Sequence, residues 1–210
     1  MDSNWPIVDS EVNALLIVAH PDDETIFCGG TILSHPSWSW NIVCVTMQQN
    51  TSRPQEFEST INMYRGFGVN INSSQTLNKP DYNQDLSQQD YDEWKESINQ
   101  LNLKPEIVLT HNIMGEYGHK HHIATSKIVQ ELFKNVWEFV YPGDPSISPQ
   151  PRKSIVKELT LDQILLSRKK EIYDTCYKSQ AYVWQVLPEL MKYEFETGPE
   201  IFTSGDENED

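Results

Sequence analysis

Short apolar runs along the chain end in clusters of polar residues, and the first run sets the pattern. Leu15 to Ala19 are consecutive apolar or small residues, and His20, Pro21 and three acids follow them directly. A continuous apolar run bounded by a turn signal is typical of a strand buried on both faces of a parallel sheet. Pro21 cannot donate to a sheet ladder, so the strand should end there, and a helix is expected from about Thr25. The polar cluster would then lie at the carboxyl end of a central strand, where open α/β sheets place their ligands.

The same pattern recurs along the chain and predicts alternating strands and helices. Further apolar runs predict strands at residues 41–47, 107–110 and 137–141. Apolar residues spaced by three to four positions predict helices at residues 54–68, 91–101, from about 121, and 161–177. Residues 70–85 are polar and rich in turn formers, and residues 142–153 form a proline-rich loop that we expect to gate the substrate. The alternation predicts a layered α/β protein with a parallel sheet.

The charge balance limits the classes of partner. Lys and Arg number 16 against 31 Asp and Glu, which gives a formal net charge of −15. This balance disfavours a nucleic-acid or anionic-membrane partner. A chain of 210 residues is expected to form one domain, which we place at residues 1–200. Residues 201–210 are expected to form an acidic disordered tail.

Cysteine usage and hydropathy bear on the compartment. Cys28, Cys44 and Cys176 are unevenly spaced and form no CxxC pair, which suits a reducing compartment. The first residues lack a basic start followed by an apolar stretch, and no apolar segment of about 18 residues occurs. We therefore expect a cytoplasmic protein without a transmembrane segment.

Histidines gather in two places that both follow predicted strands. Four of the six histidines lie between residues 111 and 122, and a fifth is His20. A catalytic zinc ion takes three protein ligands, often imidazole nitrogens and a carboxylate oxygen, and keeps one position open for water. His20 and Asp23 with a third ligand from residues 111–122 would supply such a set. The alternatives are acids that only cap a helix, and histidines that form an adventitious surface site.

The spacing within each group suggests separate roles for neighbouring side chains. Asp22 and Asp23 are adjacent, so their side chains diverge, and one can bind the metal while the other faces the metal-bound water as general base. His119 and His122 are three residues apart at a helix start and can project to the same side. One could bind the metal while the other stabilises or protonates a developing oxyanion. The residues alone therefore indicate a metal-dependent hydrolase.

Sequence motifs also resemble a known family. The sequence AHPDDE at residues 19–24 resembles the signature of the LmbE-like, or PIG-L, N-acetylglucosaminyl deacetylases. THN at 110–112 followed by GEYGHKHH at 115–122 resembles that family's second motif, GHxxH, and SQ at 179–180 resembles its later SQ pair. The resemblance implies a single-domain α/β protein with a Rossmann-like, mostly parallel sheet flanked by helices.

The resemblance also implies a reaction and the residues that carry it. Zinc, or another divalent ion such as Fe²⁺, would be bound by His20, Asp23 and His122. Asp22 would be the general base that deprotonates the zinc-bound water, and His119 would polarise the amide carbonyl or protonate the leaving amine. The substrate would be an N-acetylglucosamine-type amino sugar or its conjugate, and the products would be acetate and a free amine.

Four further residues carry expectations of different kinds. Arg53 lies about where the family has a substrate-contacting arginine, and Asp81 is a candidate for binding a sugar hydroxyl. Many relatives have Asp or Asn where this chain has His121, so a residue that orients the neighbouring histidine there must act differently or not at all. His111 is open between a structural and a functional role.

Rival functions come from the same class and from others. An amidase with the same zinc chemistry could cleave a larger conjugate amide. A nucleotide-binding module is disfavoured because no GxGxxG follows the first strand and three acids there would repel a pyrophosphate. A metal-binding protein without catalysis would not need Asp22 beside a ligand.

Overall fold

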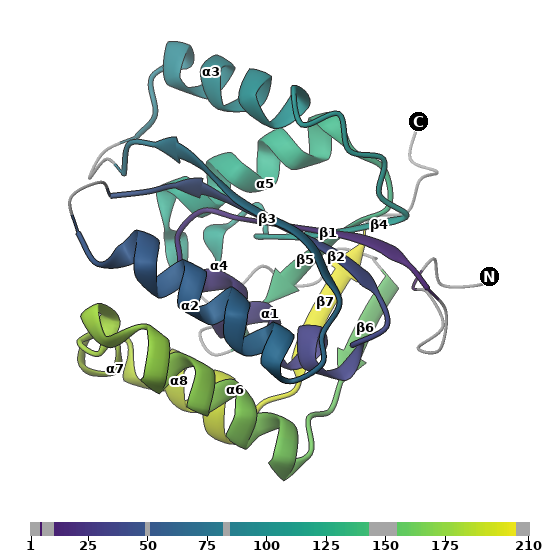
Figure 1. The fold of residues 1–210 in the computed structure, drawn as a ribbon. Helices are drawn as coiled ribbons and strands as arrows, with labels where there is room; N and C mark the ends of the chain where they lie inside the picture. Colours follow the sequence, from purple (N-terminus) through teal and green to yellow (C-terminus); the bar gives the residue numbers. More distant parts are fainter. Residues whose placement is uncertain (1–4, 6–10, 49–50, 82–84, 143–154, 205–210) are drawn as a thin grey trace.

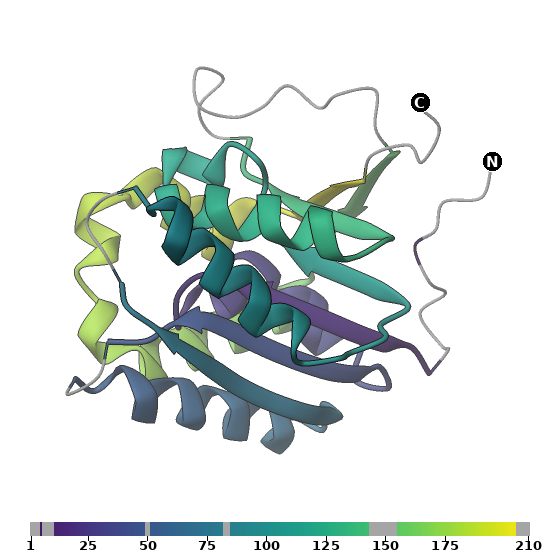
Figure 2. The same cartoon turned by 90° about the horizontal axis from the view of Figure 1, so that it is seen from above.

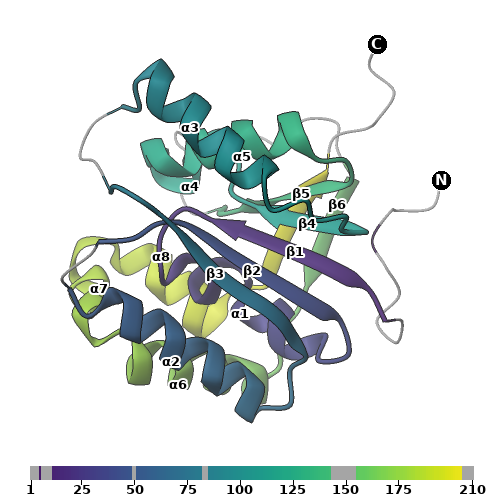
Figure 3. The ribbon, with the colours of Figure 1, turned by 45° about the horizontal axis from the view of Figure 1, so that its top comes forward.

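A mostly parallel sheet forms the centre of the molecule. The computed structural model describes residues 5, 11–48, 51–81, 85–142 and 155–204. Across these residues, seven strands form one sheet in the order β3-β2-β1-β4-β5-β7-β6. The first five strands in this order, from β3 through β2, β1 and β4 to β5, pair in parallel. Strand β7 pairs antiparallel with both β5 and β6. Figure 3 shows β3, β2 and β1 side by side. The strands are β1 (Asn13–Val18), β2 (Ser39–Thr46), β3 (Ile71–Lys79), β4 (Ile107–Thr110), β5 (Val136–Val140), β6 (Ile155–Leu159) and β7 (Glu200–Ser204).

Helices cover both faces of the sheet (Figures 1 and 2). Helices α3 and α5 lie on one face, and α1, α2 and α6 lie on the other, with α6 packed against α1 and α2. The longer helices are α1 (Asp23–Ser34), α2 (Arg53–Gly66), α3 (Gln88–Asn99), α5 (Lys120–Leu132) and α6 (Gln163–Cys176). The shorter ones are α4 (Gly115–Gly118), η1 (Lys178–Gln180), α7 (Val183–Val186), α8 (Pro188–Lys192) and η2 (Tyr193–Thr197).

The central strand β1 is buried because it serves both hydrophobic cores. Leu16 and Val18 belong to the core under α1, α2 and α6, whereas Leu15 and Ile17 belong to the core under α3 and α5. Successive side chains of a strand point to opposite faces, so a strand covered on both faces needs an uninterrupted apolar sequence. The apolar run therefore predicts this strand correctly.

The predicted strands and long helices are present, with boundaries that differ by a few residues. Helix α1 begins at Asp23 rather than near Thr25. The polar stretch at residues 70–85 was not predicted to form a strand, but it contains β3, Ile71–Lys79. Strand β3 lies at the edge of the sheet and pairs only with β2, so it does not need the continuous apolar sequence that marks the central strands.

The C-terminal boundary of the domain differs from the prediction. Residues 201–204 belong to β7, which pairs with β5 and β6, so a tail that starts at residue 201 is wrong. Residues 205–210 lie outside the described residues, as does the predicted gating loop apart from Pro142. In the part of the chain that is described, no helix has the length and apolar character needed to span a membrane.

The order of the strands determines where a site can form. Strand β1 pairs in parallel with β2 on one side and with β4 on the other. The loops that leave the carboxyl ends of β1 and β4 are therefore neighbours, although about ninety residues separate them. The chain thus extends the sheet first on one side of β1 and then on the other. Open α/β sheets bind their ligands at such a point.

Candidate metal centre and active site

The loop after β1 folds back on itself so that His20 and Asp23 face each other. The backbone N–H of His20 donates to Asp23 Oδ2 at 2.8 Å, and the backbone N–H of Asp23 donates to the His20 carbonyl at 3.3 Å. Helix α1 begins at Asp23, which fixes the direction of this carboxylate. As a result, His20 Nδ1 lies 3.2 Å from the same Oδ2 atom.

The loop after β4 brings the second group of histidines to the same edge. Gly115 and Gly118 have φ angles of 70° and 87°, and such left-handed turns favour glycine. Helix α5 starts directly afterwards, and Nδ1 of its N-cap residue His119 accepts the backbone N–H of His121 at 3.3 Å. His122 lies in the first turn of α5 and is fully buried.

Three donor atoms from the two loops form an even triangle. His20 Nδ1, Asp23 Oδ2 and His122 Nε2 are 3.2, 3.3 and 3.4 Å apart in their three pairs. Ligand atoms placed tetrahedrally at typical zinc distances are about 3.3–3.6 Å apart. The residue set that the sequence predicts as metal ligands is therefore brought together with spacing that suits a metal ion.

Other donor sets overlap this triangle. His20, His119 and His122 form one, and Asp23, His111 and His122 form another. His111 Nε2 accepts the backbone N–H of Ala19 at 2.9 Å. A backbone N–H can only donate, so the lone pair of His111 Nε2 is engaged there. We therefore do not count His111 among the donors of the triangle. Its contact with Ala19 instead holds the first loop in place.

Glu116 lies behind His122, and the sequence pattern does not predict a role for it. Its Oε2 atom accepts from His122 Nδ1 at 2.6 Å and from His111 Nδ1 at 3.0 Å. Burial opposes ionisation of Glu116, but its contacts with these two histidines prevail and lower its pKa to about 2. A proton held on His122 Nδ1 leaves the lone pair of Nε2 facing the triangle. An acid six residues before a candidate histidine ligand, in the same loop, was the available sequence signal.

Asp22 points away from the triangle, as the divergence of adjacent side chains predicts. Its carboxylate faces Arg53, with Nη1 and Nη2 each 3.5 Å from one carboxylate oxygen. Burial raises the pKa of Asp22 to about 6, although the nearby guanidinium opposes the shift. Asp22 has a φ of 123°, and its backbone N–H donates to Glu24 Oε2 at 3.0 Å. The neighbouring acids thus have different surroundings within one turn.

Glu24, Glu56 and Ser179 of the SQ pair lie behind this loop and make hydrogen bonds that support it. Tyr177 at the end of α6 donates from its hydroxyl to Glu24 Oε1 at 2.6 Å. Ser179 donates from its backbone N–H and its hydroxyl to the Glu56 carboxylate, at 2.8 and 2.6 Å. Ser179 therefore anchors the segment after α6 to α2, and Glu24 supports Asp22.

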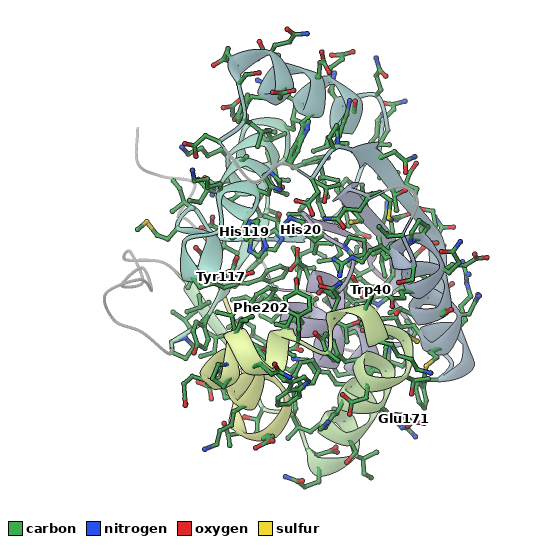
Figure 4. The ribbon with its side chains drawn as sticks, turned by 90° about the vertical axis from the view of Figure 1, so that its left-hand side faces the viewer. His20, Trp40, Tyr117, His119, Glu171 and Phe202 are labelled. Atoms are coloured by element: carbon green, nitrogen blue, oxygen red, sulfur yellow. The ribbon has the colours of Figure 1, made fainter. Side chains whose placement is uncertain are left out.

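His119 and Asp81 lie beside the triangle on its more open side. The His119 ring is partly exposed, and its centroid is 4.6 Å from that of His20. Figure 4 shows the two labelled side chains next to each other. Burial and the neighbouring His122 and His20 lower the pKa of His119 to about 3. Asp81 follows β3, and its Oδ1 atom is 3.6 Å from His20 Nε2. Every site residue that the sequence predicts thus lies in one cluster.

The fold and this cluster define an α/β protein with a buried His/Asp site at the carboxyl edge of its sheet. Residues 15–133 match the family of GlcNAc-PI de-N-acetylases, PIG-L. The chain belongs to the PIG-L family. It is also 30% identical over 158 residues to an uncharacterised protein of Acanthamoeba polyphaga mimivirus, a match that covers 66% of each chain. The chain thus spans just under two thirds of that relative.

Solved structures share the fold at low sequence identity. The pseudoaglycone deacetylase Dbv21 matches with a TM-score of 0.70 and 13% identity, over 92% of this chain and 97% of its own. The N,N'-diacetylchitobiose deacetylase of Pyrococcus horikoshii matches with a TM-score of 0.63 and 18% identity, over 96% and 86%. GalB, the 4-carboxy-2-hydroxymuconate hydratase of Pseudomonas putida KT2440, matches with a TM-score of 0.54 and 14% identity, over 94% and 99%. Because a hydratase shares the fold, the reaction must be argued from the site.

Proposed function

We propose that the protein is a zinc-dependent N-deacetylase that acts on an N-acetylglucosamine-type amino sugar or its conjugate. The observation that carries the proposal is the even triangle of His20, Asp23 and His122 with a separately held carboxylate, Asp22, beside it. A binding site alone would need only the triangle. The family match favours amide hydrolysis over hydration.

The three donors of the triangle would hold the metal ion, with Zn²⁺ as the first choice and Fe²⁺ as the alternative. Their mixture of imidazole nitrogens and one carboxylate oxygen suits either ion. A bound zinc ion supplies Lewis acidity, which polarises an amide carbonyl and makes water a stronger acid. The carboxylate of Glu116 holds His122 with its Nε2 lone pair toward the triangle.

Asp22 is the proposed general base. It takes a proton from the attacking water as the water oxygen bonds to the acetyl carbon. Arg53 holds the carboxylate with two nitrogens, so its orientation is set before substrate binds. Arg53 and Asp81 are also the proposed substrate-binding residues. Arg53 lies about where the family has a substrate-contacting arginine, and Asp81 is partly exposed beside the triangle.

His119 is the proposed partner of the amide. Its Nδ1 atom accepts the backbone N–H of His121, so its proton is on Nε2. That N–H can donate a hydrogen bond to the developing oxyanion. The proton that Asp22 took from the water passes to the leaving nitrogen as the C–N bond breaks. The nitrogen leaves as an amine, and the acetic acid formed then loses its own proton to become acetate.

Acetate release tests the proposal. Purified protein, stripped of metal and then given Zn²⁺, is expected to release acetate from at least one N-acetylglucosamine derivative in a panel that includes larger amide conjugates. No release before Zn²⁺ addition is the matched control. Bound zinc without turnover of any compound would contradict catalysis, and cleavage confined to larger acyl amides would favour the amidase alternative.

The ligand assignment has its own test. His122→Ala should lose the single bound divalent ion, because one corner of the triangle is removed. Metal content measured by mass spectrometry checks this, with His35→Ala as a control at a buried histidine that contacts Thr31 instead. Full metal content in His122→Ala would contradict the assignment.

The proposal includes a cytoplasmic location. Cys28, Cys44 and Cys176 are buried and free of disulfide bonds. Free cysteines are typical of a reducing compartment.

A further inference from the structure

The imidazole of His20 has a second nitrogen that the triangle does not use. This atom, Nε2, lies 3.1 Å from His121 Nδ1 and 3.6 Å from Asp81 Oδ1, and those two atoms are 3.3 Å apart. The three residues come from the loop after β1, the segment after β3 and the first turn of α5. His20 and His121 are buried, and the Asp81 side chain is 22% exposed.

Both neighbours of His20 Nε2 are themselves held in place. Gln48 donates from Nε2 to Asp81 Oδ2 at 2.7 Å, which leaves Oδ1 directed at the histidines. The His121 ring packs edge-on against Trp94 with centroids 5.3 Å apart. The backbone N–H of His121 donates to His119, whereas the side chain of His121 contacts His20.

His121 is not the residue that stability alone would select. Its Nε2 atom is buried and has no hydrogen-bond partner among the described residues. A buried polar atom without a partner has lost its hydrogen bonds to water and gained none, which destabilises the folded protein. Among the described residues, the polar contacts of the ring are at its Nδ1 end, with atoms of His20 and Asp81.

We propose that His121 and Asp81 are positioning residues that fix the tautomer and orientation of His20. With the proton of His20 on Nε2, His121 Nδ1 accepts it and the charge of Asp81 stabilises it. The lone pair of His20 Nδ1 is then directed at Asp23 and His122. This inference rests on the proposed metal centre, and it repeats for His20 the arrangement that Glu116 provides for His122. The imidazole of His121 therefore serves a metal ligand rather than the neighbouring His119.

The position of the contact atom gives a test that separates positioning from packing. Asparagine places a polar atom close to the position of histidine Nδ1, whereas glutamine places its polar atoms near Nε2. We expect His121→Asn to bind Zn²⁺ nearly as well as wild type. His121→Gln and Asp81→Asn should bind it 10–100-fold more weakly, the range typical of residues that orient a metal ligand. Asp85→Asn removes a charge close in sequence. Among the described residues Asp85 forms an ion pair with exposed Lys120 rather than with a histidine, so this variant is the matched control.

The measurements are the Zn²⁺ dissociation constant, from competition with a chromophoric chelator, and the visible spectrum of the Co²⁺ form. Urea midpoints of the metal-free proteins show whether each variant folds. Equal Zn²⁺ affinity in His121→Asn and His121→Gln would contradict the proposal, as would unchanged affinity in Asp81→Asn. Two ions per wild-type chain and one in His121→Gln would also overturn it, because His121 would then be a ligand. Wild type that binds no metal would contradict the proposed function itself.

Discussion

Asp22 and Asp23 are adjacent in the sequence, but their carboxylates face different groups. Asp23 closes the donor triangle, whereas Asp22 faces Arg53 outside it. The start of α1 at Asp23 and the φ angle of 123° at Asp22 separate the two directions. Two residues of one chemical type thus have different surroundings because the backbone turns between them.

This separation predicts a selective defect in Asp22→Asn. The variant should keep its bound metal, since Asp22 is not a donor of the triangle. Its kcat should fall about 10²–10⁴-fold, because an amide cannot take the proton from water. Steady-state acetate release together with metal content checks this, and Asp85→Asn is the control for loss of one negative charge. Normal kcat in Asp22→Asn would exclude its role as base.

The site residues could be predicted from the sequence where the residue type itself indicates the chemistry. His20, Asp23 and His122 follow buried strands and carry donor atoms, so their meeting could be predicted. The role of Glu116 could not, because its direction depends on a φ of 54° between left-handed glycines. No periodicity governs such a loop. The contact between His121 and His20 could not be predicted either, because the two residues lie on segments that are distant in the sequence.

At the scale of elements, burial decided which strands could be predicted. Strands β1, β2 and β4 are covered on both faces, so their sequences are apolar and distinctive. Strand β3 is partly exposed and polar, and its sequence resembles that of a loop. Strands β6 and β7 form the other, antiparallel edge, and they too lack a continuous apolar run.

The turn between β4 and α5 allows a prediction about backbone strain. A Cβ at Gly118 would meet no described atom within 4 Å, so Gly118→Ala should cost only the strain of its φ of 87°, about 1–2 kcal/mol. Gly115→Ala should cost more, because its Cβ would lie 2.9 Å from Ile123 Cγ1 in addition to the strain. Urea unfolding gives both free energies. Gly66→Ala, at the end of α2 with no contact and no positive φ, is the control, and equal stability of all three variants would contradict this explanation.

At the scale of the whole molecule, a buried ion network connects elements that are far apart in the sequence, from α1 to β7. Lys169 on α6 lies 3.0 Å from Glu194 Oε2 and 2.8 Å from Glu200 Oε1. Glu200 on β7 also accepts the backbone N–H groups of Gly30 and Thr31 on α1. One buried cation thus faces two carboxylates. The sequence separation of these residues explains why no local pattern predicts the network.

The excess carboxylate should make stability depend on pH. Burial and the neighbouring Glu200 raise the pKa of Glu194 to about 7 although Lys169 opposes the shift. The folded state therefore binds a proton that the unfolded state releases near its ordinary pKa of 4.5. This contribution to stability is complete below about pH 4.5 and is lost as pH rises through about 7.

Glu194→Gln removes the titrating group, so the difference between variant and wild type isolates its effect. Relative to the variant, wild type should lose roughly 1–3 kcal/mol of unfolding free energy between pH 4.5 and pH 8. Urea unfolding at several pH values measures the difference. A constant difference over that range would show that Glu194 does not titrate there.

The pairing of β1 with β4 also determines when the site comes into existence. His20 and His122 are 102 residues apart and meet only after both strands have entered the sheet. A peptide that contains only the first loop carries two corners of the triangle, and one that contains only the second carries the third. The nascent chain therefore cannot assemble the triangle before His122 has been synthesised and packed beside the first loop. Site formation is nonlocal, because it needs a contact between residues far apart in the sequence.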